Sequence, residues 1–289
     1  MIKQVIVGDD KVNKVRIGEG ERLCLLAGPC AIESETHAIY MAEQIAEIAE
    51  KVGVSLIYKS CYDKDCRSSP DSYHGCGIDS GLEILQKVRD QVGVPVVTDI
   101  SSAEWVEATA SVVDMLQIPA YLCRQTHLLR ACAKTKKPLH LKKGQFMNPR
   151  NMKNSLAKIY REDNHQVVLC DRGTFFGYED LVNDMRSLMI MREFGIPVSY
   201  DATHSIQQPT GSGSVSQGLR EFIPGLVRAA CGVGVDAIFM EVHDNPSRAL
   251  SDPATQLDIR FLESILRQAV DITRIVRETV VANPTEGLS

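Results

Sequence analysis

The chain has 289 residues, 44% of them hydrophobic, so it can bury a large core, and its length suits one α/β barrel better than two domains. The formal net charge of −5, from 32 basic and 37 acidic side chains, excludes a global attraction for nucleic acid or an anionic membrane surface. No stretch approaches the roughly 20 apolar residues of a spanning helix and the start lacks a signal-peptide pattern, so we expect a cytoplasmic protein with no nucleic-acid or membrane partner.

In chain order, residues 4–7 and 14–18 flank a polar turn and predict a small hairpin within residues 1–20 that closes one end of the fold. Short apolar runs of β-branched character then alternate with helical patterns, which indicates βα units and a parallel sheet. The predicted strands are 23–27, 56–60, 96–100, 114–118, 138–142, 166–170, 197–201 and 236–240. The predicted helices are 34–52, 81–92, 102–110, 125–135, 151–162, 178–194, 218–233 and 261–280. This alternation predicts one (β/α)8 TIM barrel over residues 1–289, with a frayed tail at 281–289.

The loops that follow the predicted strands are unusually polar. In a TIM barrel these loops build the active site at one mouth. Basic side chains gather there in a net-acidic chain: Lys59, Lys64, Arg67, Arg124, Lys142, Lys143 and Arg172. A single loop lysine or arginine is usually a solvated charge, but a set at corresponding strand ends indicates a site for two anionic groups, either two phosphates or a phosphate and a carboxylate.

Four potential metal ligands also follow predicted strands, although they lie far apart in the sequence. They are Cys30 after the first strand, His204 after the seventh, and Glu241 and Asp252 after the eighth. One thiolate, one imidazole and two carboxylates suit Zn²⁺, Fe²⁺, Mn²⁺ or Co²⁺ better than Mg²⁺. Each residue taken singly has an ordinary structural interpretation, so the prediction of one divalent metal, of open identity, depends on the fold.

These segments closely resemble the 3-deoxy-D-manno-octulosonate 8-phosphate synthases, also called phospho-2-dehydro-3-deoxyoctonate aldolases. The resemblance covers nearly the whole chain and is carried by AGPCAIES, KS-x-YDK-xx-RSS, QIPAYLCRQT, KKGQF, DRGTFFGY, DATHS and FMEVH with SDPATQL. It implies a homotetrameric barrel that joins phosphoenolpyruvate to D-arabinose 5-phosphate and water, giving phosphate and an eight-carbon 2-keto sugar acid phosphate for lipopolysaccharide. Members with cysteine after AGP use a divalent metal, so Cys30 implies the metal-dependent type.

The resemblance also implies roles by position. Phosphoenolpyruvate would be held by Lys59, Lys64, Gln117, Lys142 and Arg172, with the last two on its phosphate. Asp99 and Gln145 would line the space between the substrates. The acceptor phosphate would be bound by Arg67 and Ser68, with Arg124 reaching over from a neighbouring subunit. The implied catalytic set is Lys64, Asp99, Gln145, His204 and Asp252.

Several positions depart from the family pattern, mostly on the acceptor side. They are Cys61, Cys66, His74, His127 and Gln217. Cys66 replaces an amide side chain expected to touch the acceptor, which removes a strong hydrogen-bonding group. Two interpretations stay open: a modified or different aldose-phosphate acceptor, or ordinary drift among arabinose 5-phosphate enzymes.

Two further hypotheses compete with this function. A 3-deoxy-heptulosonate 7-phosphate synthase would use erythrose 4-phosphate with the same barrel and metal, but its second loop typically reads K-P-R-T, where this chain has Asp65-Cys66-Arg67-Ser68. A non-catalytic barrel that binds phosphosugars would explain the substitutions as decay. Decay would be expected to reach the metal ligands and phosphate-binding arginines as well, and those are present.

Overall fold

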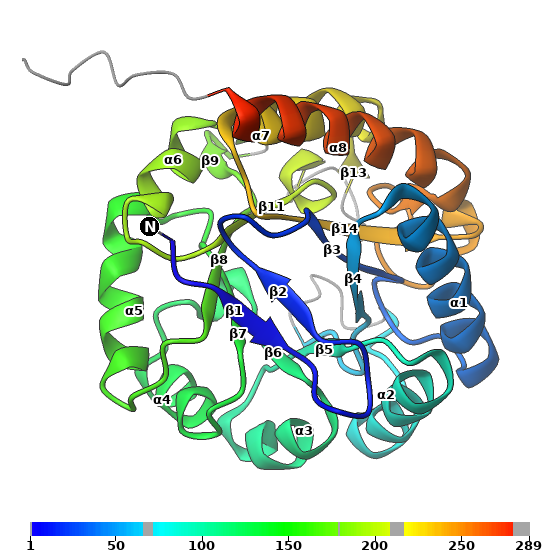
Figure 1. Ribbon diagram of the computed structural model, residues 1–289. Coiled ribbons are helices and arrows are strands. Elements are labelled where there is room, and N and C mark those ends of the chain that lie inside the picture. The colour runs from blue at the N-terminus through cyan, green and yellow to red at the C-terminus, as the bar shows by residue number, and fades with distance from the viewer. Residues whose placement is uncertain (1, 66–71, 179, 209–216, 280–289) are drawn as a thin grey trace, which may run out of the picture.

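The structure is a computed structural model that describes residues 2–65, 72–178, 180–208 and 217–279. Its centre is a closed barrel of parallel strands, in which β14 pairs with both β3 and β11 (Figure 1). The barrel strands are β3 (Cys24–Gly28), β4 (Ser55–Lys59), β5 (Val96–Asp99), β6 (Met115–Ile118), β7 (Leu139–Lys142), β8 (Val167–Asp171), β11 (Val198–Asp201) and β14 (Ala237–His243). The predicted TIM barrel is therefore confirmed.

Helices surround the barrel and alternate with its strands (Figure 1). They are α1 (Glu35–Val52), α2 (Ile78–Val92), α3 (Val106–Val112), α4 (Thr126–Lys134), α5 (Met152–Tyr160), α6 (Arg186–Arg192), α7 (Ile223–Val233) and α8 (Leu262–Glu278). The first of them begins where the Ser34 side chain accepts a hydrogen bond from the His37 backbone N–H, and it ends at Gly53, whose φ of 81° favours glycine. Among the described residues, no helix combines the length and apolar character needed to cross a membrane.

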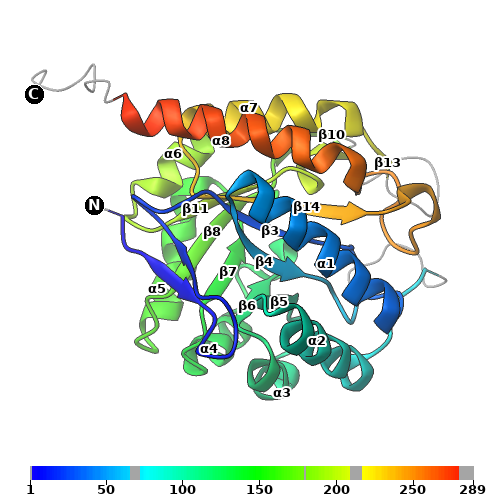
Figure 2. The ribbon, with the colours of Figure 1, turned by 45° about the vertical axis from the view of Figure 1, so that its right-hand side comes forward.

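The predicted N-terminal hairpin is present as β1 (Val5–Val7) and β2 (Val15–Ile17), paired antiparallel. Figure 1 shows it lying across one end of the barrel, and Figure 2 shows the carboxyl end of β14 on the opposite side. The buried side chains of the hairpin join the barrel interior in one apolar cluster. That cluster contains Val5, Val7, Val15, Ile17, Cys24, Leu26, Ile57, Val97, Met115, Val168, Ala237 and Phe239.

One predicted helix was wrong in its first half. The segment 178–194 was expected to be helical, but residues 180–182 form β10 (Asp180–Val182), which pairs antiparallel with β9 (Thr174–Phe176). Only α6 remains of that prediction. Gly177 follows β9 with a φ of 66°, which favours glycine, and the chain reverses to pair with β9 instead of beginning a helix.

Further short strands were also not predicted. A strand pair, β12 (Gln207–Gln208) with β13 (Gln217–Gly218), replaces the start of the helix expected over 218–233. β15 (Leu257–Asp258) extends the sheet beside the end of β14. Strand β14 itself runs to His243, so Glu241 lies inside the strand rather than after it. The correction matters for the site because a strand fixes the direction of a side chain better than a loop does.

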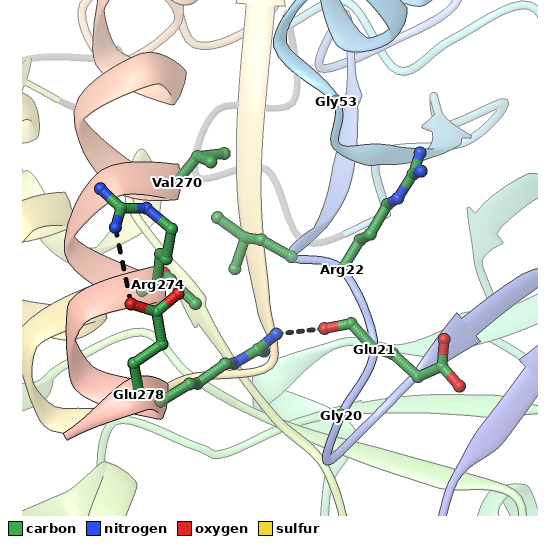
Figure 3. Close-up of a pocket in the computed structure, with 10 residues that line it drawn as sticks. Gly20, Glu21, Arg22, Gly53, Val270, Arg274 and Glu278 are labelled. Carbon is green, nitrogen blue, oxygen red and sulfur yellow. Dashed lines mark hydrogen bonds and ion pairs between the residues drawn. The ribbon is translucent and has the colours of Figure 1, made fainter.

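A pocket lies at the end of the barrel where the strands begin. Figure 3 shows it between the segment 20–23 and helix α8. The Arg277 guanidinium donates a hydrogen bond to the Glu21 carbonyl, and Arg274 Nη1 lies 3.5 Å from Glu278 Oε2. Because the pocket is at the amino ends of β3 and β4, it is remote from the mouth at which a TIM barrel carries its chemistry.

Candidate active site

The polar mouth arises from the two-residue period of the barrel strands. Side chains two positions apart on a strand point to the same face, so each inward apolar residue is followed by another inward residue nearer the mouth. The steps are Ile57 to Lys59, Val97 to Asp99, Met115 to Gln117, and Phe239 to Glu241. The apolar members belong to the hairpin-side cluster, and the polar members are buried or nearly so. The barrel interior therefore changes from apolar to charged within one pleat.

Lys59 lies at the centre of this layer of charge. Its Nζ is 3.2 Å from Asp99 Oδ2 and 3.2 Å from Glu241 Oε1, and Lys64 Nζ is 3.5 Å from the same glutamate oxygen. Burial alone would lower the pKa of Lys59, but Asp99 and Glu241 outweigh it and hold that pKa above its usual value. Burial would likewise raise the pKa of Asp99, yet Lys59 and Lys64 hold it well below its usual range. All four groups are therefore charged at neutral pH.

A second buried ion pair joins Lys142 to Asp201. Lys142 Nζ is 2.6 Å from Asp201 Oδ2 and 3.6 Å from the centre of the Phe239 ring. The same carboxylate oxygen lies 2.8 Å from His204 Nδ1. Burial would raise the pKa of Asp201, but His204 and Lys142 hold it well below its usual range. The carboxylate thus orients the imidazole through Nδ1 and leaves Nε2 directed toward Glu241, 3.5 Å away.

A chain of hydrogen bonds holds the side chain of Gln117 in place. Its Oε1 lies 2.7 Å from His140 Nδ1, and His140 Nε2 lies 2.7 Å from Ser199 Oγ. The Gln117 amide nitrogen donates to Asp99 Oδ1. Burial, and then the positive charge of Lys142, lower the pKa of His140 to about 3, so this imidazole is neutral at physiological pH. The network fixes the amide of Gln117 at the mouth, because both ends of the side chain are held.

Three of the four predicted metal ligands form one cluster, and the fourth, His204, lies beside it. Donor atoms of Cys30, Glu241 and Asp252 lie within 4.8 Å of one another, and His204 Nε2 is 3.5 Å from Glu241 Oε1 and 4.0 Å from Asp252 Oδ2. Cys30 Sγ is 3.4 Å from Asp252 Oδ2. Asp252 adopts a φ of 46°, a strained conformation for a residue with a side chain, and such strain tends to occur at functional sites.

The chemistry of this set fits a divalent cation. Burial, and then the nearby carboxylate of Glu241, raise the pKa of the Cys30 thiol well above its usual value. A cation among these donors would offset that repulsion and allow the thiolate to form. Glu241 Oε2 is buried and makes no hydrogen bond to any described residue, so this oxygen is left for such a ligand.

Basic and amide groups from the next loops complete the mouth. Lys143 Nζ donates to the Gly173 carbonyl at 3.0 Å, and Arg172 Nη2 donates to Gln207 Oε1 at 2.7 Å. Arg172 Nε and both polar atoms of the Gln145 amide are buried without a hydrogen-bond partner among the described residues. Buried polar atoms are rarely left unsatisfied, so these groups indicate a polar ligand at the mouth. Lys143, one of the basic residues predicted to gather at this mouth, is fully buried, with its Nζ bonded to backbone carbonyls and to Thr174 Oγ1 and lying 3.5 Å from Asp171 Oδ1.

Not every predicted site residue is brought to this cluster. Arg67, Ser68 and the substituted Cys66 lie outside the described residues. Arg124 is exposed, and its backbone carbonyl accepts a hydrogen bond from Lys158 Nζ at 2.6 Å. Of the predicted residues, the structure gathers Cys30, Lys59, Lys64, Asp99, Gln117, Lys142, Gln145, Arg172, His204, Glu241 and Asp252 around the mouth.

Two residues at the mouth were not predicted from sequence, Asp201 and His140. Both face inward from barrel strands, and both contact a predicted residue directly. The signal that could have found Asp201 is its place at the carboxyl end of a strand, in DATHS, three residues before His204. His140 sits inside a strand, where a histidine is more often a core residue.

The residues that depart from the family pattern occupy different environments. Cys61 is buried, and its thiol donates to the Asp63 carbonyl at 2.7 Å. Burial, and then the charge of Asp99, raise the pKa of this thiol to about 12, so it stays protonated. His74 and His127 are exposed, and Gln217 is the first residue of β13. Of the departing residues that the structure describes, only Cys61 is thus placed next to the cluster of charges.

Comparisons with known proteins agree with this geometry. A family model described as the DAHP synthetase I family matches residues 4–278. Proteins named 2-dehydro-3-deoxyphosphooctonate aldolase are similar over most of their length. The one from Laribacter hongkongensis is 51% identical over 271 residues, covering 92% of this chain and 96% of its own. The one from Bordetella petrii is 49% identical over 268 residues, covering 90% and 94%.

A third relative of the same name, from Syntrophotalea carbinolica, is 47% identical over 267 residues, which cover 92% of this chain and 96% of that protein. Matches of this identity and coverage establish the family directly, and they agree with the barrel and its charged mouth. The chain belongs to the DAHP synthetase I family and, within it, to the 2-dehydro-3-deoxyphosphooctonate aldolases.

Proposed function

We propose that this enzyme condenses phosphoenolpyruvate with D-arabinose 5-phosphate and water to give 3-deoxy-D-manno-octulosonate 8-phosphate and phosphate, a C–C bond-forming transfer. The observation that carries the proposal is the buried mouth, where Lys59, Lys142 and Arg172 stand beside a cysteine–histidine–carboxylate cluster. Relatives named 2-dehydro-3-deoxyphosphooctonate aldolase support this reaction. The product would serve lipopolysaccharide synthesis in the cytoplasm.

Phosphoenolpyruvate would bind on the basic side of the mouth. Its phosphate would lie on Lys142 and Arg172, and the partnerless Arg172 Nε supports this because a phosphate oxygen would satisfy it. Its carboxylate would lie near Lys59, Lys64 and Gln117. Lys142 is already paired with Asp201, so the substrate would share that lysine with the carboxylate rather than meet a free charge.

The carbon chemistry needs charges at fixed points. As C3 of phosphoenolpyruvate attacks the aldehyde carbon, positive charge develops at C2 and negative charge on the aldehyde oxygen. Water then adds to C2, and phosphate departs by cleavage of the C–O bond. The negative Asp99 and Glu241 would stabilise positive charge at C2, and Lys64 would stabilise the developing alkoxide. The buried Gln145 amide, which has no partner among the described residues, would orient the two reactants.

Cys30, His204, Glu241 and Asp252 would hold one divalent metal, which supplies Lewis acidity toward the aldehyde or the attacking water. Asp201 would hold His204 in the tautomer whose Nε2 carries the lone pair. Ser251 Oγ, 3.0 Å from Cys30 Sγ, would orient the sulfur. Zn²⁺, Fe²⁺, Mn²⁺ and Co²⁺ all suit this donor set.

The acceptor phosphate would be bound by Arg67 and Ser68, with Arg124 supplied by a neighbouring subunit. The exposure of Arg124 supports this arrangement, because an exposed side chain is accessible to another copy of the chain. This assignment requires an oligomer, and we propose the homotetramer. The substitutions at Cys61 and Cys66 would change how the acceptor is held rather than the chemistry at phosphoenolpyruvate.

The test is phosphate release from phosphoenolpyruvate with arabinose 5-phosphate, in metal-replete and chelator-treated protein. We expect turnover that is lost with the metal and restored by adding it back. Ribose 5-phosphate and erythrose 4-phosphate are the comparison acceptors. A higher kcat/KM with either would replace the proposed acceptor, and no turnover with any of the three would contradict the proposed reaction.

A further inference from the structure

A second group of potential metal ligands lies beside the mouth. Donor atoms of Glu33, His37 and His243 lie within 4.8 Å of one another. The carboxylate of Asp244 joins them, with Oδ1 2.9 Å from His243 Nδ1 and 3.1 Å from His37 Nε2. None of these residues was singled out from the sequence or has a role in the proposed reaction. We refer to these four residues as the two-histidine cluster.

The fold brings the two-histidine cluster together from adjacent elements. His243 is the last residue of β14, which pairs in parallel with β3 and places Glu241 opposite Gly28. Glu33 follows β3 a few residues later. His37 is in the first turn of α1, where its backbone N–H donates to Ser34 Oγ at 3.2 Å. Strand pairing and a capped helix therefore fix the backbone on both sides of the cluster.

The contacts inside the cluster place electron pairs against one another. The Asn245 backbone N–H donates both to His243 Nδ1, at 2.9 Å, and to Asp244 Oδ1, at 3.0 Å. His243 Nδ1, which accepts this bond, also lies 2.9 Å from the carboxylate oxygen Asp244 Oδ1. Two acceptors at that separation repel each other unless a cation or a proton lies between them.

His243 is held in the way metal-binding histidines usually are. His243 Nε2 lies 3.3 Å from Glu33 Oε1, which also accepts the Leu250 backbone N–H at 2.8 Å. A carboxylate on the far nitrogen of an imidazole raises its basicity and fixes its orientation. His37 Nδ1 is buried with no hydrogen-bond partner among the described residues, while its Nε2 faces Asp244. The Asp244 side chain is 40% exposed, so an ion can reach the cluster from solvent.

We propose that the two-histidine cluster is a second divalent-metal site. Ligands around a tetrahedral zinc ion at about 2.0–2.1 Å are roughly 3.3 Å apart. The separations of 2.9 and 3.1 Å from Asp244 Oδ1 to the two imidazoles need only small side-chain shifts to reach that spacing. Two imidazoles with carboxylate oxygens suit Zn²⁺, Co²⁺ or Ni²⁺ and disfavour Mg²⁺.

The second site would act on the mouth through its loops. Glu33 lies three residues after Cys30, and Leu250, which donates to Glu33, lies two residues before Asp252. An ion at His243 Nδ1, with Glu33 bonded to the far nitrogen of the same ring, would tie the loop that carries Cys30 to the strand and loop that carry Glu241 and Asp252. Because a ligand that binds only the folded state stabilises it, occupancy would raise the melting temperature.

The experiment counts bound cobalt and separates the two sites by their spectra. Metal-free full-length protein is dialysed to equilibrium against buffered Co²⁺, and bound cobalt is measured together with its absorption. Cobalt at Cys30 gives a thiolate-to-cobalt charge-transfer band, whereas cobalt at the two-histidine cluster gives none. His37→Leu removes a donor of the cluster alone. The matched control is His165→Leu, since His165 Nε2 also lies near a carboxylate, 3.7 Å from Asp163 Oδ1, but His165 belongs to no metal-ligand cluster in the described part of the chain.

We expect two equivalents of cobalt in the wild type and in His165→Leu, and one equivalent in His37→Leu with its charge-transfer band undiminished. That band also reports that the variant is folded; if His37→Leu does not fold, His37→Gln is measured in its place. A single equivalent in the wild type, carried by the thiolate band, would overturn the proposal, as would two equivalents in the folded His37 variant. No catalytic assay is used, so failure here leaves the proposed reaction untouched.

Discussion

At the hairpin end of the barrel the inward side chains are apolar, whereas two residues further along the same strands they are charged. Ile57 and Val97 belong to the apolar cluster, while Lys59 and Asp99 form an ion pair at 3.2 Å. Burial of the first pair stabilises the fold, because apolar surface leaves water. Burial of the second carries a desolvation penalty, which the opposite charges of the neighbouring side chains must offset. The comparison indicates that the apolar packing at the hairpin end stabilises the fold, and that this stability allows charged groups to be held in place at the mouth.

The largest expected effect tests the two ends of β3. Cys30→Ala removes a proposed metal ligand, and we expect phosphate release to fall at least about 1,000-fold, since a catalytic metal supplies several kcal/mol of transition-state stabilisation. Bound metal should fall with it. Cys24→Ala is the control, because Cys24 is also a buried thiol on this strand but lies in the apolar cluster. Equal activity losses in the two variants would remove the functional distinction between the ends.

The next effect concerns stability at the hairpin end. Ile17 is fully buried in the apolar cluster between the hairpin and the barrel interior. Ile17→Ala should therefore lower the free energy of unfolding by about 2–5 kcal/mol. Urea unfolding measures this change. Ile6→Ala, in the same hairpin with its side chain outward, should change it little. The folded Ile17→Ala enzyme should keep its kcat/KM, and a loss there would show that the hairpin influences the mouth.

A smaller effect is expected from the aspartate that orients His204. Asp201→Asn should weaken binding of the metal about 10- to 100-fold, as is usual when a carboxylate behind a metal-bound histidine is changed. Competition with a chromophoric chelator measures this affinity. Asp236→Asn is the matched control, because Asp236 is also a fully buried aspartate, paired with Arg192 near the start of β14. It should lose stability and keep metal affinity; the reverse pattern would contradict the assigned role of Asp201.

The smallest effect is the pH dependence contributed by His140. Its pKa is lowered to about 3 in the folded protein, whereas an unfolded histidine has a pKa of about 6.5. Between these values the unfolded state binds more protons, so stability contributed by the neutral imidazole is complete above about pH 6.5 and is lost as pH falls toward 3. The slope is at most about 1.4 kcal/mol per pH unit.

His140→Gln should flatten this slope between about pH 6.5 and 4.5, above the range in which most carboxylates titrate. Urea midpoints measured across that interval, in the wild type and the variant, make the comparison. Glutamine can still bond to Gln117 and Ser199, so the change tests the titration more than the packing. An unchanged slope in the variant would assign the pH dependence to other groups.

Much of the architecture follows from the sequence alone. The alternation of β-branched runs with helical patterns predicted the barrel, because a strand buried on both faces must be apolar and short. The hairpin was predicted by its turn and its alternating residues. The helix predicted over 178–194 was wrong in its first part because the apolar spacing there fits a helix as well as a strand. Only the pairing of β10 with β9 decides between them.

Part of the candidate site could likewise be predicted from the sequence, and part could not. Chemical type and strand position were enough to predict that Cys30, His204 and Glu241 share one mouth, since parallel strands in a barrel bring their carboxyl ends together. Which atoms meet depends on side-chain direction and on strand register, and these are set by packing across the whole barrel. The Lys142–Asp201 pair, the network through His140 and the meeting of His37 with His243 were therefore decided only by the tertiary structure.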